Sequence, residues 1–456
     1  MNKTEKKHEV TQNACKLCTP LGACLALKGI KGAITLLHGS QGCSTYIRRY
    51  MISHFREPID IASSNFSEDT AIFGGNSNLK TALTNIIKQY NPEVIGIPTT
   101  CLSETIGDDV NMIIKEYISE NEDENLPEFI TVSTPSYKGT HIDGFHETVR
   151  SVVSAVSGHP GEKSVNNSRI NIFPGMVSAE DIRHLKEIIS DFGLDYIMLP
   201  DYSETLDGQL WTDYKNIPEG GTSIDKIREM DSSAASVEFG KSLDGTESAS
   251  RILSERSAVN TFNTGLPIGI NETDKFMNIL SEISGRGIPE KYLSERGRLI
   301  DAYADAHKYI FGVKAALYGE EDLVIGLASF LSEIGIIPVL CASGGNSGRF
   351  SEILFKAVPD LSPDETSVYS DADFSDIEEQ IKFLKPDLII GNSKGYSISR
   401  STDIPLIRTG FPIHDRIGGQ RILHLGYRGA QQLFDKAVNS VIEKRQDSSP
   451  VGYSYM

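Results

Sequence analysis

The chain is organised around residues 14–43, which read ACKLCTPLGACLALKGIKGAITLLHGSQGC. Two of its cysteines, Cys18 and Cys43, bracket a mostly apolar run, and Gly39 and Gly42 stand just ahead of the second. Glycine permits positive φ and close approach of another backbone or of a ligand. We therefore expect Cys43 on a loop that can wrap around a bulky group.

A third cysteine, Cys101, follows the apolar run VIGIPTT at residues 94–100. A short apolar run bounded by turn signals is typical of a buried strand, and ligands of open parallel sheets bind beyond the carboxyl ends of the strands. Thiolates are the usual protein ligands of iron–sulfur clusters. Two interpretations therefore stay open from the residues alone: Cys18, Cys43 and Cys101 converge on a cluster, or they are unrelated core or surface thiols.

Cys15 and Cys18 also form a C-x-x-C pair, which raises the alternatives of zinc and redox chemistry. A zinc site needs a second ligand pair, and none occurs at a suitable spacing. A thioredoxin-like site needs the motif at a strand-to-helix turn, whereas a polar tail precedes it here. We favour neither alternative. Cys341 ends the apolar segment IPVLC and is expected to be a core thiol.

The composition describes an ordinary globular protein. Its 456 residues are enough for two to four domains, and 39% of them are hydrophobic. The net charge of −18 argues against a general nucleic-acid binder, which would carry a basic face. No apolar run is long enough to cross a bilayer, and residues 1–12 are polar without a signal core. We expect a cytoplasmic protein, in which the six cysteines are not paired as structural disulfides.

Strand and helix patterns alternate along the whole sequence, and they restart twice. A polar linker at 164–168 (SVNNS) and a long helical pattern at 289–311 mark the restarts. We predict an α/β fold of three Rossmann-like domains, with mainly parallel sheets whose strand ends face a common cleft. The predicted domains are an N-terminal cluster-binding domain at 1–163, a second α/β domain at 164–288, and a third with bridging and closing helices at 289–456.

Several polar residues near the cysteines could be taken for catalytic or metal-binding groups. Residues 106–117 have a helical pattern with Asp108 and Asp109 in the first turn, where carboxylates complement the helix dipole. We predict a capping role for both, rather than metal binding. We likewise expect His38 and His54 to be structural, hydrogen-bonded histidines rather than catalytic ones.

A series of short motifs runs in order along the chain. They are CTPLGA (18–23), HGSQGC (38–43), HFREP (54–58), TTC (99–101), IGDD (106–109), TPS (134–136), LPD (199–201), LDG (206–208), GNS (391–393) and GFP (410–412). Together they resemble the β-type chain of the nitrogenase component 1 family, and the resemblance covers essentially the whole sequence.

The resemblance implies a specific site. In catalytic β chains of the family, the cysteines of these motifs ligate an iron–sulfur cluster shared with a partner chain, so Cys18, Cys43 and Cys101 are the implied metal ligands. The cluster would be of the 4Fe-4S or eight-iron P-cluster type. Ser136 would correspond to the serine that also ligates the P-cluster when it is oxidised. The remaining cysteines near the N-terminus do not match ligand positions, and no catalytic residue is expected on this chain alone.

Three kinds of family member compete. We favour a NifN-like scaffold that matures the iron–molybdenum cofactor precursor for nitrogen fixation with a NifE-like partner, because segments 206–210 (LDGQL) and 415–421 (DRIGGQR) and the short stretch before Cys18 resemble that type. The alternatives are the electron-relaying β subunit of a nitrogenase and a nitrogenase-like reductase such as methylthio-alkane reductase. The complete set of cysteines, with Ser136, fits these alternatives.

Each of these functions belongs to a complex. The resemblance implies a homologous α-type chain in an α2β2 heterotetramer, a transient ATP-dependent iron protein, and neither nucleic acid nor membrane as a partner. An alternative from outside these functions is a cluster-free protein that uses the same fold to bind a small molecule.

Overall fold

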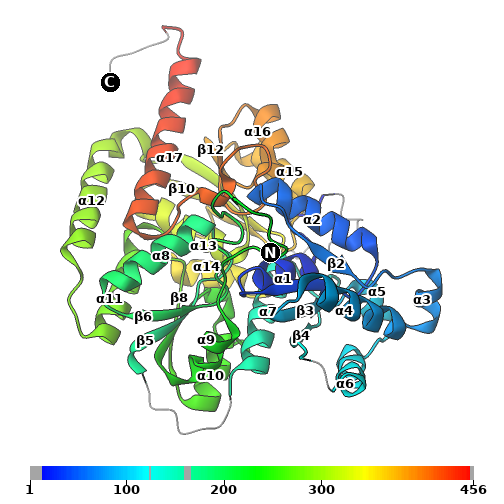
Figure 1. Ribbon diagram of the computed structural model, residues 1–456. Helices are drawn as coiled ribbons and strands as arrows, with labels where there is room; N and C mark the ends of the chain where they lie inside the picture. Colours follow the sequence, from blue (N-terminus) through cyan, green and yellow to red (C-terminus); the bar gives the residue numbers. More distant parts are fainter. Residues whose placement is uncertain (1–12, 123–124, 159–165, 452–456) are drawn as a thin grey trace.

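The computed structural model describes residues 13–122, 125–158 and 166–451, and these form an α/β protein built on three sheets (Figure 1). Within these residues, the named strands pair only in parallel. This confirms the predicted fold class. None of the helices in the described ranges has both the length and the apolar character needed to cross a membrane.

The N-terminal unit is a four-stranded sheet in the order β2-β1-β3-β4. Its two central strands are buried along their whole length, as uninterrupted apolar sequences predict for a sheet covered on both faces. The elements are α1 (Thr19–Leu27), β1 (Ala33–Leu37), α2 (Gln41–Phe55), β2 (Ile61–Ser63), α3 (Glu68–Phe73), α4 (Asn76–Tyr90), β3 (Val94–Pro98), α5 (Cys101–Ile106), α6 (Val110–Glu120), β4 (Glu128–Val132) and α7 (His141–Val156).

The second unit is a four-stranded sheet in the order β6-β5-β7-β8. Residues 164 and 165 of the predicted linker lie outside the described residues, and the rest of it already belongs to β5. The elements are β5 (Asn166–Phe173), α8 (Ala179–Asp191), β6 (Asp195–Met198), α9 (Ile224–Arg228), η1 (Met230–Ser232), β7 (Ser233–Phe239), η2 (Lys241–Leu243), α10 (Ala249–Ser257), β8 (Asn260–Thr264) and α11 (Gly269–Ser284).

The third unit is a five-stranded sheet in the order β11-β10-β9-β12-β13. The long helix that leads into it packs against the closing helix of the chain, and Figure 1 shows the two at one side of the molecule. The elements are α12 (Glu290–Ile310), β9 (Lys314–Gly319), α13 (Glu321–Glu333), β10 (Ile337–Ser343), α14 (Phe350–Ala357), β11 (Ser367–Tyr369), α15 (Phe374–Leu384), β12 (Leu388–Gly391), η3 (Ser393–Gly395), α16 (Tyr396–Thr402), β13 (Leu406–Arg408), η4 (Gly419–Arg421) and α17 (Gly426–Ser448).

Each sheet has a point at which the strand order reverses. These points lie between β1 and β3, between β5 and β7, and between β9 and β12. The loops that leave such a pair of strands diverge and open a crevice in which ligands bind. The three sheets fall within the predicted ranges 1–163, 164–288 and 289–456, and the boundaries of the domains stay a prediction.

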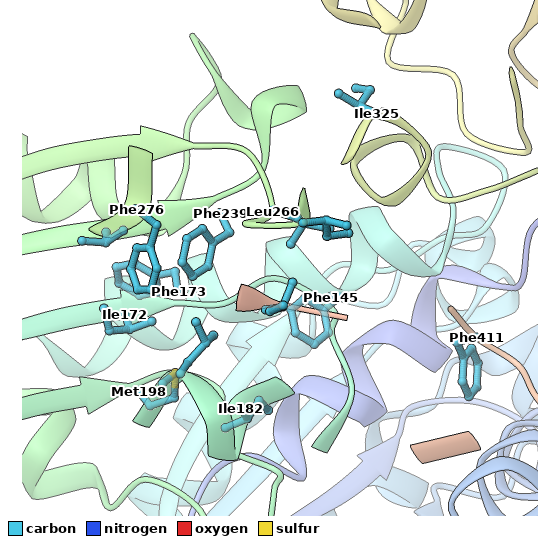
Figure 2. Packing of buried hydrophobic residues seen from close by; sticks show 14 of the residues in the cluster. Phe145, Ile172, Phe173, Ile182, Met198, Phe239, Leu266, Phe276, Ile325 and Phe411 are labelled. Carbon is cyan, nitrogen blue, oxygen red and sulfur yellow. The ribbon is translucent and has the colours of Figure 1, made fainter. Parts of the chain in front are cut away.

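One hydrophobic core runs through all three units. Figure 2 shows part of it, where Phe145 of α7 lies near Phe173 and Phe239 at the ends of β5 and β7. The rings of Phe239 and Phe276 meet edge to face at 5.2 Å between centroids. A shared core of this kind holds the units in a fixed arrangement, because separating them would expose large apolar side chains to water.

Buried polar pairs also join the units. The amide of Leu17 donates to Nδ1 of His141, which leaves Nε2–H to donate to Glu320 at 3.1 Å. The carboxylate of Asp181 accepts hydrogen bonds from the His424 ring and from the backbone amides of His424 and Leu425. Burial acts to raise the pKa of Asp181, but His424 and these amides hold the pKa below its usual value.

One predicted helix was placed wrongly. Residues 106–117 do not form a single helix, because Gly107, with φ of +80°, ends α5 in a left-handed turn. The next helix, α6, begins only at Val110. Asp109 caps it by accepting the amide of Met112, which confirms the capping role for that residue. Asp108 has a different role, described below.

Candidate metal centre

The three predicted cysteines each lie at the start of a helix. Cys18 is the N-cap residue of α1, Cys43 lies in the first turn of α2, and Cys101 is the first residue of α5. This corrects the expectation of a cysteine within a loop, because α2 already begins at Gln41. The positive end of a helix dipole favours an anionic sulfur, so helix N-termini suit thiolates better than loops would.

The segments that lead from β1 into α2 and from β3 into α5, just ahead of Cys43 and Cys101, are fastened to each other. They follow β1 and β3, where the strand order of the first sheet reverses. The hydroxyl of Thr100 donates to the carbonyl of His38 at 3.0 Å. Gly39 has no room for a side chain, since a Cβ there would stand 2.2 Å from Oγ1 of Thr100. Gly39 therefore allows the close approach that its sequence position predicted.

Gly42 behaves differently from Gly39. A Cβ on Gly42 would meet only Oγ of Ser40, at 3.9 Å, among the described residues. Its φ is not in the left-handed region. Nothing within this part of the chain therefore requires glycine at position 42.

Ser136 connects the other two cysteine positions. Its backbone N–H donates to the sulfur of Cys101 at 3.2 Å, and its hydroxyl oxygen accepts the amide of Thr19, next to Cys18, at 3.1 Å. Ser136 follows β4, which pairs with β3, so the sheet delivers it beside the Cys101 loop. The structure thus brings Cys18, Cys43, Cys101 and Ser136 to one end of the N-terminal sheet.

Helix α1 reaches this place through an unusually close crossing with α7. A Cβ on Gly22 would stand 1.6 Å from the carbonyl oxygen of His141, and one on Gly144 would stand 2.0 Å from that of Thr19. Every residue of α1 is buried, and Pro20 at its start suits the first turn, where an N–H has no partner within the helix. The position of Cys18 therefore depends on two glycines that the sequence analysis did not single out.

The exposure of the sulfurs separates two groups of cysteines. Cys18 and Cys43 are partly buried and Cys101 is exposed. Burial, with smaller contributions from the two other cysteines, raises the pKa of Cys18 to about 12. An anionic sulfur there needs a positive partner such as a metal. The remaining cysteines are buried in the core, which confirms the expectation for Cys341, and burial raises the pKa of each: they are Cys15, Cys24 and Cys341.

The cysteines do not enclose a metal position by themselves. Across the described ranges, no group of three or more His, Cys, Asp or Glu side chains is arranged to hold a metal ion. The site reaches the surface of the chain, because Cys101 is exposed and Cys18 and Cys43 are only partly buried. A bulky group at this place would therefore leave part of its surface uncovered by this chain.

A buried hydrogen-bond network holds the segment between β1 and α2, which leads to Cys43. His38 is fully buried, and its ring lies 3.1 Å from Oγ of Ser64 and 3.0 Å from the carboxylate of Asp108. Asp108 also accepts the amide of Gly75 at 3.0 Å. Burial lowers the pKa of His38, although Asp108 acts to raise it. This confirms a structural His38 and shows that Asp108 binds His38 rather than capping a helix.

His54 is also structural. Its side chain is buried, and Nδ1 accepts the amide of Ile413 at 2.8 Å, which requires the neutral ring. Burial lowers the pKa of His54 to about 3. Its ring meets that of Phe411 at 4.8 Å. His54 thus ties α2 to the third unit, as a satisfied histidine and not as a catalytic base.

Comparisons with known proteins agree with this arrangement. The sequence model of the family described as nitrogenase component 1 type oxidoreductase matches residues 18–442. The nitrogenase molybdenum–iron protein beta chain of Clostridium pasteurianum is 38% identical over 436 residues, which cover 95% of this chain and 93% of that protein. The beta chain of Methanothermobacter thermautotrophicus is 36% identical, with 97% of each chain covered. That of Azotobacter vinelandii is 34% identical, with 97% of this chain and 86% of that protein covered.

Solved structures give the same result. A chain of the structure titled "Nitrogenase Cp1 at pH 6.5" has a TM-score of 0.94 and 34% identity, and covers 100% of this chain and 98% of its own length. A chain of "Nitrogenase Cp1 at pH 5" has a TM-score of 0.72 at 16% identity, which shows likeness of fold alone. The chain thus belongs to the nitrogenase component 1 family, as a β-type subunit.

Proposed function

We propose that this chain is the electron-relaying β subunit of a nitrogenase-type complex, and that Cys18, Cys43 and Cys101 ligate an iron–sulfur cluster shared with an α-type chain. The observation that carries the proposal is the double contact of Ser136, whose N–H reaches Cys101 and whose hydroxyl reaches the residue after Cys18. That contact ties two cysteines, far apart along the chain, to one place.

The donor set fits a cluster of this kind. Thiolates are the usual ligands of iron–sulfur clusters, and iron would supply the positive charge that a partly buried Cys18 thiolate lacks. Ser136 would offer an additional oxygen ligand when the cluster is oxidised. When bound, the group would supply one-electron redox chemistry. The residues of this chain would hold it at helix N-termini and keep the loops rigid through His38 and Thr100.

The proposal assigns half of the site to another chain. Three cysteines that do not enclose a metal position, one of them exposed, are what an interface cluster would require. A homologous α-type chain would provide the remaining ligands within an α2β2 heterotetramer. A transient ATP-dependent iron protein would deliver the electrons. The chemistry on substrate would then belong to a cofactor on the α-type chain. The group that we assign to the cysteines of this chain is a 4Fe-4S or eight-iron cluster.

The relay function is preferred over the scaffold for two reasons. The complete ligand set of Cys18, Cys43, Cys101 and Ser136 is kept, and the relatives described above are named as molybdenum–iron protein beta chains. The NifN-like scaffold with a NifE-like partner stays the second candidate, because segments 206–210 and 415–421 resemble that type. In the structure the two segments touch: Arg421 pairs with Asp207 at 3.2 Å.

The test is anaerobic co-purification of the chain with its natural partner. The proposal expects an α-type chain in equal amount, a brown complex with iron–sulfur absorption, and substrate reduction once iron protein and ATP are added. A coloured complex that reduces nothing but donates a cofactor to an apo-nitrogenase would favour the scaffold instead. A colourless complex without iron would exclude both, and would favour the cluster-free small-molecule binder.

A further inference from the structure

A second candidate site adjoins the proposed cluster site, and Cys18, Cys43 and Cys101 do not line it. A cleft of about 580 Å³ opens where the three units meet. Its walls come from the carboxyl ends of β5, β7, β9 and β10 and from α7. β5 and β7 flank the strand reversal of the second sheet, and β9 borders that of the third, so the cleft occupies the place where such folds bind ligands. Its volume is typical of small-molecule sites.

One wall of the cleft is apolar. Phe145, Phe173, Phe239 and Leu266 line it, and Figure 2 shows these side chains gathered from α7, from the ends of β5 and β7 and from the segment after β8. Hydrocarbon placed against this wall would leave water, which favours binding in proportion to the area covered. The faces of phenylalanine rings also attract cations.

The charged part of the lining is mostly acidic. Carboxylates outnumber lysines and arginines there. Three of the basic side chains are already engaged: Lys16 pairs with Asp371, Arg349 donates to the carbonyl of Asp244, and Arg150 pairs with Glu147 and Glu247. The carboxylates are Asp143, Glu147, Glu238, Glu247, Glu320, Glu321 and Asp322, and the lysines and arginines are Lys16, Lys138, Arg150 and Arg349.

Among the described residues that line the cleft, one buried acceptor lacks a partner. The Glu321 side chain is only 8% exposed; Oε1 accepts the amide of Ser347 at 3.1 Å, but the buried Oε2 has no hydrogen-bond partner. A buried acceptor without a donor costs free energy. Glu321 therefore keeps unmet acceptor capacity on the lining of the cleft.

The charge state of Glu321 depends on what lies beside it, and a neutral His146 ring stands on the same lining. Burial lowers the pKa of His146, although Asp322, Glu238 and Asp143 act to raise it, so the ring is neutral and offers a lone pair. Burial raises the pKa of Glu321, an effect that the hydrogen bonds from Ser347 partly offset. A cation beside Glu321 would reverse that rise and keep the carboxylate ionised.

We propose that this cleft binds an aliphatic di- or polyamine, with one ammonium group on the unpartnered oxygen of Glu321 and the methylene chain along the phenylalanine wall. An ammonium group brings donors to the unmet acceptor, and further ammonium groups would face the other carboxylates. A hydrocarbon chain matches the apolar wall, which a bare metal ion would not use. The inference goes beyond the electron-relay function and does not depend on it, since Cys18, Cys43 and Cys101 do not line the cleft.

The test is calorimetric titration of spermidine into the complex of this chain with its α-type partner, at about physiological salt so that loose surface attraction is screened. We expect one spermidine bound per β-type chain. Neutral 1,8-octanediol, of similar length, and calcium chloride should give no comparable binding. E321Q should weaken spermidine binding about tenfold or more, because it removes a charge-assisted hydrogen bond. E365Q, at an exposed position outside the cleft, is the matched control.

A second variant guards against misfolding of E321Q. Thr246 lies at the exposed rim of the cleft, so T246W would block the entrance without disturbing the core. The proposal would be overturned if spermidine did not bind to the unmodified complex. It would also be overturned if E321Q and T246W both bound spermidine as tightly as the unmodified complex does. Equal binding of octanediol, or calcium binding that depends on Glu321, would also overturn it. Iron content, measured on the same samples, reports on the cluster separately, so failure of one proposal is not mistaken for failure of the other.

Discussion

The backbone N–H of Ser136 lies 3.2 Å from the sulfur of Cys101, while the hydroxyl of the same residue accepts the amide of Thr19. One residue thus holds both the start of α1 and the start of α5. This contact is local to the proposed cluster site, and it can be tested without any bound metal.

Replacing Ser136 by alanine should loosen the start of α1. The S136A variant keeps the N–H that reaches Cys101 but leaves the Thr19 amide, at 3.1 Å in the parent, without its acceptor. An unsatisfied buried donor costs about 1–3 kcal/mol, so hydrogen exchange of peptides spanning 14–27 should speed up by about tenfold. S133A, whose hydroxyl bonds only to the side chain of Glu104, is the control. Unchanged exchange in S136A would contradict the assigned contact.

Gly144 should not tolerate a methyl group. In G144A the new Cβ would stand 2.0 Å from the carbonyl oxygen of Thr19, so α1 must move away from α7. We expect a lower melting temperature and loss of bound iron, because Cys18 begins α1.

The matched control for this substitution is G297A. Gly297 also lies within a helix, α12, but nothing stands within 4 Å of its would-be Cβ. The alanine there should be neutral or stabilising, by up to about 1 kcal/mol. Similar behaviour of the two variants would mean that the close crossing does not position Cys18.

Replacing Asp108 should speed up hydrogen exchange in more of the chain than replacing Asp109. In D108L, His38 and the amide of Gly75 lose their shared acceptor, so peptides covering 38–43 and 74–79 should both exchange faster. In D109A only the cap of α6 is lost, at a cost of about 1 kcal/mol, and faster exchange should stay within that helix. Indistinguishable exchange patterns would contradict the separate roles.

His54 predicts a definite dependence of stability on pH. Its pKa is about 3 in the folded chain, below the ordinary 6.5 that applies after unfolding. Between these values unfolding takes up a proton, so stability falls as pH falls, by about 1.4 kcal/mol per pH unit from this residue. The free energy of unfolding of the iron-free chain should be measured by denaturation at several pH values between 7 and 4. Its slope against pH should be shallower in H54Q, by the amount that corresponds to the uptake of one proton. H307Q, at an exposed position, is the control, and an unchanged slope in H54Q would contradict the buried neutral ring.

The sequence predicted what depends on local pattern. The buried strand before Cys101, the cap at Asp109 on α6 and the core position of Cys341 follow from periodicity and capping chemistry. The order of motifs predicted the family. These features are encoded by neighbouring residues, so a single sequence is enough to find them.

What the sequence did not predict depends on contacts between distant segments. Gly22 and Gly144 look like ordinary glycines until α1 crosses α7. Asp108 looked like a cap because the left-handed turn at Gly107 gave no clear break in the helical pattern. Glu321 and His146 belong to different units, and only the arrangement of the sheets brings them to one cleft.

The central claim is that Cys18, Cys43 and Cys101 bind iron at an interface. Its most direct test is iron content, by chemical analysis and electron paramagnetic resonance, of the anaerobically purified complex with each cysteine replaced in turn by alanine. We predict that C43A lowers cluster iron and weakens pairing with the α-type chain, while the core control C341A keeps both. A variant lacking all three cysteines that retained unchanged iron and pairing would contradict the account.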